Sequence, residues 1–270
     1  MTGCAAPAIA VIPARLASTR LPDKPLLART GRPLIAHVVD TAHRARLLER
    51  VIVATDDDRI AAAATAAGAE AALTRADHPN GTSRIAEVVA RLWPEATDPA
   101  SHAARRIIVN LQGDEPELDP ALIDRLVEAL RQQPDPAATP MATIAGAFEP
   151  GEDAADPNLV KVVLDTRGRA LYFSRAVIPH DREGNDRHDG GGSAPLKHAG
   201  IYAYRAGFLL DYANLPPTPL EQMEKLEQLR ALEHGYHIAV ITARLTHHGI
   251  DTAAQYEAFV QRYHASSPAD

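Results

Sequence analysis

The apolar positions of the chain are grouped in short runs that polar loops follow directly. Ile9 to Ile12 is apolar throughout and ends at Pro13, which is typical of a strand buried in a parallel sheet. Comparable runs follow at Arg50 to Thr55, Glu70 to Leu73, Ile107 to Leu111 and Met141 to Phe148. These runs are predicted to form the strands of one sheet.

Segments with helical periodicity separate the apolar runs. They are predicted at Pro33 to Leu47, Ile60 to Ala67 and Pro120 to Leu130. Three acidic residues, Asp56 to Asp58, precede the second of these helices, where a helix N-terminus favours negative charge. Strands that alternate with helices predict an α/β fold with a mainly parallel sheet.

The alternation stops in the middle of the chain. Val160 to Leu164 and Ala170 to Phe173 flank the turn residues Asp165 to Gly168, so they predict an antiparallel hairpin. Lys197 to Arg205 is predicted to return as a strand. We interpret this region, residues 157–216, as a smaller antiparallel subdomain within a single domain.

The domain itself is predicted to span residues 1–270. Its last part contains a predicted helix at Pro219 to His234 and a strand at His237 to Ala243. Trp93 to Ala104 is predicted to be a surface loop, and the polar segment Glu183 to Ala194 a mobile one.

The loop after the first strand carries the first candidate chemistry. It contains Arg15, Ser18, Thr19, Arg20 and Lys24. Cations and hydroxyls placed just after a strand suit a polyphosphate, because open α/β sheets bind ligands at the carboxyl ends of their strands. A solvated basic loop is the alternative. Neither a glycine-rich dinucleotide fingerprint nor a Walker-type sequence is present, so side chains would hold the phosphates.

An acidic loop follows the strand at Ile107. Its sequence is Gln112-Gly113-Asp114-Glu115-Pro116. Mg²⁺ prefers oxygen ligands and takes few of them from the protein, so a carboxylate at this position is a candidate Mg²⁺ ligand in a phosphate site. The alternative is an acidic turn that caps the next helix.

A third loop, Thr74 to Arg84, follows the strand at Glu70. Arg75 and Arg84 could contact a nucleotide, and Thr82 or Ser83 could cap the helix that follows. Taken alone, this loop is weak evidence for a function.

Two further polar clusters are open to ordinary interpretations. Glu224, Glu227 and Gln228 share a helix face, and spacing alone favours a solvated face. The neighbours His247 and His248 suggest zinc, but adjacent side chains rarely converge on one ion, so we do not predict a zinc site.

Composition narrows the class of function. The chain has 270 residues, 46% of them hydrophobic, and a net charge of −7, which disfavours nucleic acid as a partner. No apolar run approaches the ~20 residues of a membrane helix, and no signal peptide is predicted. Cys4 is the single cysteine, so an internal disulfide is impossible and a reducing, cytoplasmic location is expected.

Taken together, the motifs resemble the 3-deoxy-manno-octulosonate cytidylyltransferase (CMP-Kdo synthetase) family. The resemblance runs from Ile9 to about Glu257. Its motifs are the loop from Arg15 to Leu26, Gln112 to Pro116, Leu171 to Arg175, His198 to Tyr202, the helix with Glu227, and Gly249 to Thr252. It implies a Rossmann-like nucleotide-diphospho-sugar transferase fold, and transfer of CMP from CTP to 3-deoxy-D-manno-octulosonate (Kdo) with release of pyrophosphate. The product would serve lipopolysaccharide biosynthesis.

The resemblance also implies roles for individual residues and a two-fold homodimer formed through the antiparallel region. Lys24, Arg15 and Asp114 would be catalytic. CTP would be bound by Arg15, Ser18, Lys24, Arg75, Gly81 and Gln112. The sugar would be bound by Arg175, His198, Tyr202, Glu227 and Gln228. Mg²⁺ would be held by Asp114 and Asp251.

The chain departs from the family pattern in the third loop, and two other functions remain open. Asn80 stands where the family has a serine, and Ser83 where it has an acid, which puts the role of position 83 in doubt. One alternative is a CMP-sialic acid synthetase. The other is a catalytically silent nucleotide-binding protein, which Lys24, Asp114 and Asp251 together argue against.

Overall fold

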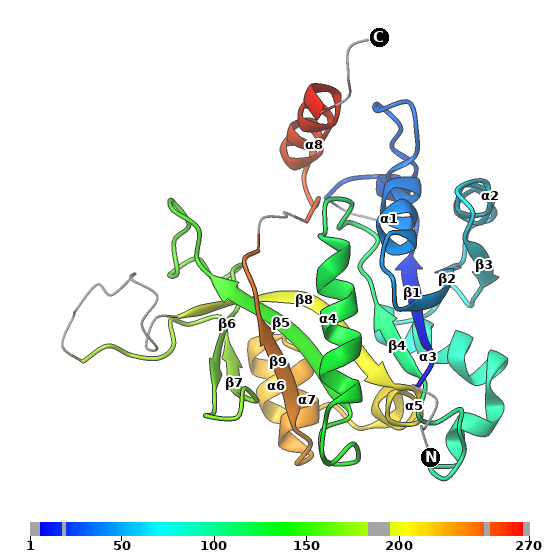
Figure 1. The fold of residues 1–270 in the computed structure, drawn as a ribbon. Helices are drawn as coiled ribbons and strands as arrows, with labels where there is room; N and C mark the ends of the chain where they lie inside the picture. The colour runs from blue at the N-terminus through cyan, green and yellow to red at the C-terminus, as the bar shows by residue number, and fades with distance from the viewer. Residues whose placement is uncertain (1–5, 18–19, 183–194, 246–248, 267–270) are drawn as a thin grey trace.

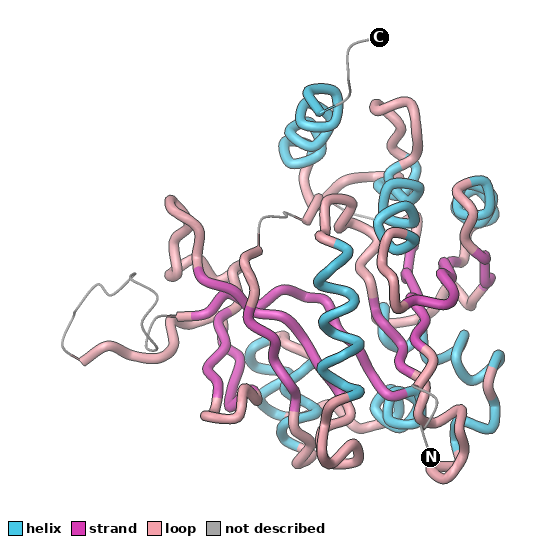
Figure 2. Tube along the Cα trace, viewed as in Figure 1, coloured by secondary structure: helices cyan, strands magenta, loops and turns pink. Residues whose placement is uncertain are grey.

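The computed structural model describes residues 6–17, 20–182, 195–245 and 249–266 of the chain. The described residues form a nine-stranded sheet with helices on both faces (Figure 1). Its main path runs β3-β2-β1-β4-β8-β5-β9, and the hairpin of β6 and β7 attaches to β8. Figure 2 shows the strands between helices that lie in front of them and behind them.

The elements follow the predicted runs closely. The strands are β1 Ala8–Ala14, β2 Leu48–Thr55, β3 Glu70–Leu73, β4 Ile107–Asn110, β5 Met141–Ala147, β6 Lys161–Leu164, β7 Ala170–Ser174, β8 Leu196–Arg205 and β9 Ile238–Thr242. The α-helices are α1 Leu34–His43, α2 Asp58–Ala66, α3 Gly81–Leu92, α4 Pro120–Arg131, α5 Ala206–Asn214, α6 Pro219–Glu224, α7 Gln228–Glu233 and α8 Ala253–Ser266. Two short 3₁₀ helices are η1 Lys24–Leu26 and η2 Pro94–Thr97.

The sheet is mixed. β1 pairs in parallel with β2 and β4, β2 with β3, and β5 with β9. β8 is antiparallel to both β4 and β5, and the β6–β7 hairpin is antiparallel as well. The predicted α/β fold with a mainly parallel sheet and a small antiparallel hairpin is confirmed.

Alternating residues of β1 fill two separate cores. Ala10 and Ile12 pack on the face covered by α1, α2 and α4. Ile9 and Val11 pack on the opposite face, which α3 and α5 cover. Because successive side chains of a strand point to opposite faces, a strand buried on both sides is apolar at every position. This burial explains the uninterrupted run at the start of the chain.

The residue that caps the helix start agrees with the sequence prediction for α2 and differs from it for α3. Asp57 caps α2, with its side chain accepting from the backbone N–H groups of Arg59 and Ile60. At α3 the cap is Asn80, whose side chain accepts from Ser83 N, so the prediction of a cap at Thr82 or Ser83 is wrong. An Asn at this position satisfies one of the N–H groups that a helix start leaves unpaired.

The predicted helix from Pro219 to His234 is wrong as a single element. It divides into α6 and α7 at Lys225, which adopts a left-handed conformation with φ 54°. The Glu224 carbonyl turns outward and accepts from Arg175 Nε at 2.7 Å. This tertiary contact outweighs the helical propensity of the segment.

The prediction of a surface loop at Trp93 to Ala104 is also wrong in part. The segment contains η2, and both Trp93 and Ala96 are buried. Two guanidinium groups lie over the Trp93 ring, with Arg50 at 5.3 Å and Arg106 at 5.0 Å from its centroid. These cation–π contacts hold the segment against the body of the protein.

Aromatic residues of the antiparallel region are buried in the core of the chain. Tyr202 and Tyr204 are on β8, which runs between β4 and β5 in the main path of the sheet. Tyr204 is 2% exposed and Phe173 on β7 is 0% exposed, so both serve the core of the chain itself. Their presence is therefore no argument for an intermolecular surface.

None of the helices in the described part combines the length and apolar character that crossing a bilayer requires.

Candidate active site

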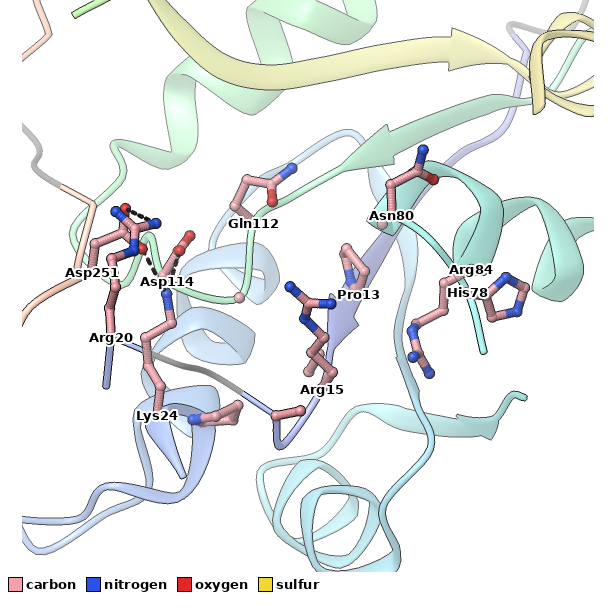
Figure 3. Close-up of a pocket in the computed structure, with 15 residues that line it drawn as sticks. Pro13, Arg15, Arg20, Lys24, His78, Asn80, Arg84, Gln112, Asp114 and Asp251 are labelled. Atoms are coloured by element: carbon pink, nitrogen blue, oxygen red, sulfur yellow. Dashed lines mark hydrogen bonds and ion pairs between the residues drawn. The ribbon is translucent and has the colours of Figure 1, made fainter. Parts of the chain in front are cut away.

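A polar cavity opens where β1, β3 and β4 end. It has a volume of about 310 Å³ and is lined mainly by three loops that follow these strands (Figure 3). The lining residues are Pro13, Ala14, Arg15, Ala17, Arg20, Lys24, Pro25, His78, Asn80, Gly81, Arg84, Gln112, Gly113, Asp114 and Asp251. We call this space the first cavity. The carboxyl-end position is the usual ligand site of an open α/β sheet.

The Lys24 ammonium group joins two carboxylates at one end of the first cavity. Its Nζ donates to Asp114 Oδ2 at 2.7 Å and to Asp251 Oδ1 at 3.1 Å (Figure 3). Arg20 adds a second cation, 3.2 Å from Asp251 Oδ2. The Lys24 side chain is only 16% exposed, so its charge is largely removed from water. The arrangement brings two carboxylates within reach of a single cation.

The backbone around Lys24 is held by its own turn. Asp23 adopts a left-handed conformation with φ 52°, and Pro25 is buried at the start of η1. A proline in this position has a fixed φ angle, so the loop loses less conformational entropy when it is ordered. The loop presents Lys24 in a defined place before any ligand arrives.

Glu115 lies among these charged groups. Its pKa is raised to about 8, mainly by burial and also by the neighbouring carboxylates Asp114 and Asp251, while Lys24 opposes the rise. Glu115 is therefore protonated and neutral at physiological pH, and it adds no charge to the two carboxylates and two cations at this end of the cavity.

Two glycines allow the loops to approach β1. A Cβ on Gly113 would lie 3.2 Å from the Pro13 carbonyl oxygen, and one on Gly81 would lie 3.1 Å from Pro13 Cγ. Both distances are tighter than ordinary van der Waals contact. Glycine at these positions therefore lets the acidic loop and the start of α3 close around the end of β1.

The opposite end of the first cavity is basic and aromatic. Arg84 is 3% exposed, and its Nη1 lies 2.5 Å from Thr74 Oγ1 and 3.4 Å from Asp56 Oδ1. His78 is held by Glu87, with 2.5 Å between His78 Nε2 and Glu87 Oε2. Figure 3 shows His78 and Arg84 apart from the cluster of Lys24. The cavity thus has two chemically different ends.

A second cavity of about 180 Å³ adjoins the first. It is lined by Gly81, Thr82, Asn110, Gln112, Met141, Tyr202, Tyr204, Tyr212, Glu227 and Gln228. Gly81 and Gln112 line both cavities, so the two spaces meet there. We call this space the second cavity. Its lining of hydroxyl, amide and carboxyl groups suits a polar ligand rich in hydroxyls.

Glu227 is the one carboxylate among the residues that line the second cavity. Burial raises its pKa, whereas a hydrogen bond from Thr82 and the charge of Arg230 lower it. Its Oε1 is buried and has no hydrogen-bond partner among the described residues. A buried carboxyl oxygen without a partner is costly, so a ligand hydroxyl placed there would relieve the cost.

The tyrosines of the second cavity stay protonated. Burial raises the pKa of Tyr202, Tyr204 and Tyr212, and the charge of Glu227 raises all three further. Tyr212 Oη donates to the Glu227 backbone carbonyl at 2.6 Å, which ties α5 to the start of α7. The hydroxyl groups are therefore available as neutral hydrogen-bonding groups over the whole physiological pH range.

Most residues predicted for the site lie on one of the two cavities. The first cavity contains Arg15, Lys24, Gly81, Gln112, Asp114 and Asp251. The second contains Tyr202, Glu227 and Gln228. Ser18, His247 and His248 lie outside the described residues.

Three predicted residues line neither cavity. Arg75 is exposed and lies 3.5 Å from Asp77 and 3.6 Å from Glu87. His198 lies behind Tyr202, with Nε2 2.9 Å from Thr143 Oγ1. Burial lowers its pKa to about 3, so it is neutral at physiological pH.

Arg175 is the third. Its guanidinium donates to backbone carbonyls, at 2.8 Å to Pro157 O and 2.7 Å to Glu224 O. These bonds join the end of β7 to α6 and to the segment before β6 rather than to a cavity.

Sequence reasoning missed several lining residues. His78 and Asn80 belong to the third loop, whose place after a strand was a usable signal. Asn110 is the last residue of β4 and could have been found in the same way. Tyr212 lies on α5, and nothing in the local sequence indicates that this helix reaches the site.

Comparison with known proteins finds relatives that match almost the whole chain. The cytidylyltransferase family model matches residues 9–238. The 3-deoxy-manno-octulosonate cytidylyltransferase of Syntrophobacter fumaroxidans (strain DSM 10017 / MPOB) is 50% identical over 254 residues, covering 93% of this chain and 95% of that protein. The protein of the same name from Acidovorax ebreus (strain TPSY) is 47% identical over 267 residues, covering 94% and 96%.

Solved structures of similar fold also match this chain. A CMP:2-keto-3-deoxy-manno-octonic acid synthetase complexed with CTP superposes with a TM-score of 0.83 at 41% identity, covering 96% of this chain and 99% of that one. A 4-diphosphocytidyl-2C-methyl-D-erythritol synthase gives a TM-score of 0.59 at 14% identity, covering 94% and 97%, and shows a similarity of fold alone.

Proposed function

The chain belongs to the 3-deoxy-manno-octulosonate cytidylyltransferase family, and we propose that it transfers CMP from CTP to Kdo in the two joined cavities. The observation that carries this proposal is the contact of Lys24 with Asp114 and Asp251 beside a separate, hydroxyl-lined cavity. One cavity suits a nucleotide triphosphate and the other a polar sugar acid. Pyrophosphate is the second product.

CTP occupies the first cavity in this proposal. Lys24 and Arg15 contact the phosphates, and the start of α3 at Gly81 adds backbone N–H groups and the positive end of a helix dipole. Gln112 lies between the two cavities, where it can contact both substrates. Ser18 and Arg75 stay predicted nucleotide contacts.

Asp114 and Asp251 fit a bound Mg²⁺. Both carboxylates already contact one cation, the Lys24 ammonium group, so their oxygen atoms converge on a single point. Mg²⁺ uses one or two carboxylates and completes its octahedron with water and substrate phosphates. When bound, it would neutralise phosphate charge and polarise the α-phosphate. The described residues hold no group of three or more His, Cys, Asp or Glu arranged for a metal, which suits a site completed by substrate.

Kdo occupies the second cavity. Glu227 Oε1 accepts from a sugar hydroxyl, and Gln228 and Tyr202 supply further hydrogen bonds. His198 supports Tyr202 from behind, at 5.4 Å between ring centroids. Arg175 and His198 stay predicted sugar contacts that would require a rearrangement when the sugar binds.

The reaction joins the two cavities at Gly81 and Gln112. The anomeric hydroxyl oxygen of Kdo loses its proton to solvent and forms a bond to the α-phosphorus. The bond from this phosphorus to the oxygen that bridges to the β-phosphate breaks, and that oxygen leaves with the pyrophosphate. Such transfers depend on in-line positioning and on charge stabilisation more than on covalent help from the protein. Lys24 and Arg15 stabilise the charge that grows on the leaving pyrophosphate.

We further propose a homodimer formed through residues 157–216, and a cytoplasmic reaction that serves lipopolysaccharide biosynthesis. Leu171 on β7 is 61% exposed, and Met223 on α6, just outside this range, is 81% exposed. Glu224 joins these elements by accepting from Ser174 Oγ at 2.7 Å. Large exposed apolar side chains on neighbouring elements suit a protein interface.

Release of pyrophosphate from CTP tests the proposed function. The purified chain is incubated with Mg²⁺ and CTP, and Kdo is compared with N-acetylneuraminate as acceptor. Pyrophosphate that depends on Kdo supports the proposal. Pyrophosphate with the sialic acid alone identifies the sister activity, and none with either sugar identifies a silent nucleotide-binding protein.

A further inference from the structure

The C-terminal helix α8 contacts every loop that supplies a charged group to the Lys24 cluster. We propose that α8 is a positioning helix, in which Tyr256 and Arg262 set the spacing of Lys24, Asp114 and Asp251 without touching substrate. The proposal deepens the proposed function and rests on it for its kinetic part. Figure 1 shows α8 beside the loop that leads into α1.

The first connection joins α8 to the loop that carries Lys24. Arg29 N donates to Tyr256 Oη at 2.9 Å, and the Arg29 side chain also pairs with Glu257. The backbone of this loop is thus hydrogen-bonded directly to a helix more than 200 residues later in the sequence, the two bonded residues being 227 positions apart.

A separate hydrophobic cluster strengthens this first connection. It is distinct from the two sheet cores and contains Leu21, Leu34, Ile250, Tyr256, Phe259 and Val260, with Leu27 packed against it. Leu21 and Leu27 flank Lys24 in sequence, and Ile250 immediately precedes Asp251. Burial of apolar surface therefore brings the two segments together.

The second connection joins α8 to the acidic loop. Arg262 makes a bidentate contact with Glu117, at 2.9 Å from Nε and 2.5 Å from Nη2. The backbone adds a bond from Ile250 N to the Asp114 carbonyl at 2.9 Å. A two-pronged Arg–carboxylate pair fixes direction as well as distance. It lies three residues beyond Asp114, so it restrains the loop that carries this carboxylate.

The third connection is the start of α8 itself. Gln255 Oε1 accepts from Asp251 N and from Thr252 N, each at 2.9 Å, and Gln255 N donates to Thr252 Oγ1 at 3.2 Å. This reciprocal arrangement is a capping box. It fixes the backbone at Asp251, so the orientation of this carboxylate depends on where α8 lies.

His37 on α1 adds a further contact with α8. His37 itself is not part of the Lys24 cluster. Its Nε2 lies 2.7 Å from Thr30 Oγ1, and its ring meets Phe259 and Tyr263 edge to face at 5.3 Å and 4.9 Å. The loop between Lys24 and α1 is therefore held by α8 at Arg29 and again next to Thr30.

Tyr256→Phe and Arg262→Gln test the proposal on the full chain. Tyr256→Phe keeps the ring and removes the hydroxyl, and Arg262→Gln removes the contact with Glu117. Hydrogen exchange of the free protein is measured for peptides covering residues 21–34 and 112–117. We expect faster exchange in 21–34 for the first variant and in 112–117 for the second, by about fivefold each, the change that loss of one hydrogen bond produces.

Two variants serve as matched controls. Ser266→Ala removes a hydroxyl from the same helix that donates to the Tyr263 carbonyl within α8, and it leaves the Arg29 bond in place. Glu70→Gln breaks a bidentate pair of the same kind, with Arg50 at 2.7 Å and 2.6 Å, on β2 and β3. Neither is expected to change exchange in residues 21–34 or 112–117.

Titration with CTP and steady-state kinetics complete the test. We expect Tyr256→Phe and Arg262→Gln to weaken CTP binding and lower kcat by about fivefold, with KM for Kdo unchanged, because none of these contacts reaches the second cavity. Unchanged exchange in both peptides, faster exchange spread over the whole chain, or an equal effect of Ser266→Ala would each overturn the proposal. Hydrogen exchange is measured without substrate. It therefore tests the role of α8 even if the proposed function is wrong.

Discussion

Asp114 and Asp251 point at the same ammonium group, although one follows β4 and the other precedes the last helix. Lys24 Nζ lies 2.7 Å from the first carboxylate and 3.1 Å from the second. Like charges this close are stable only with a cation between them. The free protein therefore contains a charge arrangement that a metal ion and phosphates can take over.

Lys24→Ala is expected to lower turnover by about two orders of magnitude, because one preorganised charge contact to the leaving phosphates is lost. Initial rates of pyrophosphate release under saturating CTP and Kdo give the measurement. Circular dichroism and thermal unfolding of the same preparation establish that the fold is intact. Near-normal turnover in a folded variant would remove Lys24 from the catalytic machinery.

Asp114→Asn and Asp251→Asn are each expected to weaken Mg²⁺ binding, because an amide oxygen carries no full negative charge. The Mg²⁺ concentration for half-maximal activity should rise by roughly tenfold or more, since loss of even an outer partner of a metal ligand costs that much. Glu149→Gln, which breaks an exposed pair with Arg244, is the matched control. Mg²⁺ curves that superpose on that of the unmodified chain would contradict the assignment.

Glu227→Gln is expected to raise KM for Kdo by about tenfold, because a hydrogen bond to a charged acceptor is replaced by a neutral one. KM for CTP should stay unchanged. Glu224→Gln is the control, since Glu224 bonds to Ser174 Oγ and Arg175 N and lines neither cavity. An equal rise in both Michaelis constants for Glu227→Gln would argue against a sugar contact.

His198 is expected to make the protein sensitive to acid. Burial lowers its pKa from 6.5 to about 3 in the folded chain. Between these values the unfolded chain binds a proton that the folded chain does not, so stability is present above pH 6.5 and is lost as the pH falls toward 3.

His198→Gln, which can keep a bond to Thr143, should lose less stability than the unmodified chain as the pH is lowered through this range. Urea unfolding at neutral and at acidic pH measures the difference. The comparison concerns the slope with pH, so a uniform loss of stability in the variant does not affect it. Identical slopes would show that His198 is not the group responsible.

The proposed dimer is testable in solution. Light scattering at micromolar concentration should give twice the chain mass, and Met223→Glu should lower it toward the monomer because a charge in an apolar interface is costly. Lys225→Glu changes charge at the next position beyond α6 and serves as control. A monomer mass that persists with CTP and Mg²⁺ would rule the dimer out.

Local patterns in the sequence predicted the strands and much of the site. Uninterrupted apolar runs mark β1, β2 and β4 because helices cover both faces of the sheet. Because the ends of these strands could be located, the loops that follow them could be located as well. Arg15, Lys24 and Asp114 come together because carboxyl ends of parallel strands meet at one edge.

Nonlocal contacts decide what the sequence pattern could not show. The place of β8 between β4 and β5 depends on pairing across the sheet, which no local run encodes. The break at Lys225 depends on Arg175 bonding to the Glu224 carbonyl, in a segment whose residues favour a helix. Tyr212 reaches the second cavity through the packing of α5, so its role required the structure.

The most direct test of the account is pyrophosphate release from CTP by the unmodified chain with Kdo and Mg²⁺. The account predicts release that requires all three, with CMP-Kdo formed in equal amount and with activity lost on chelation of the metal. Release that continues without Kdo, or no release with all three present and the protein folded, would contradict it.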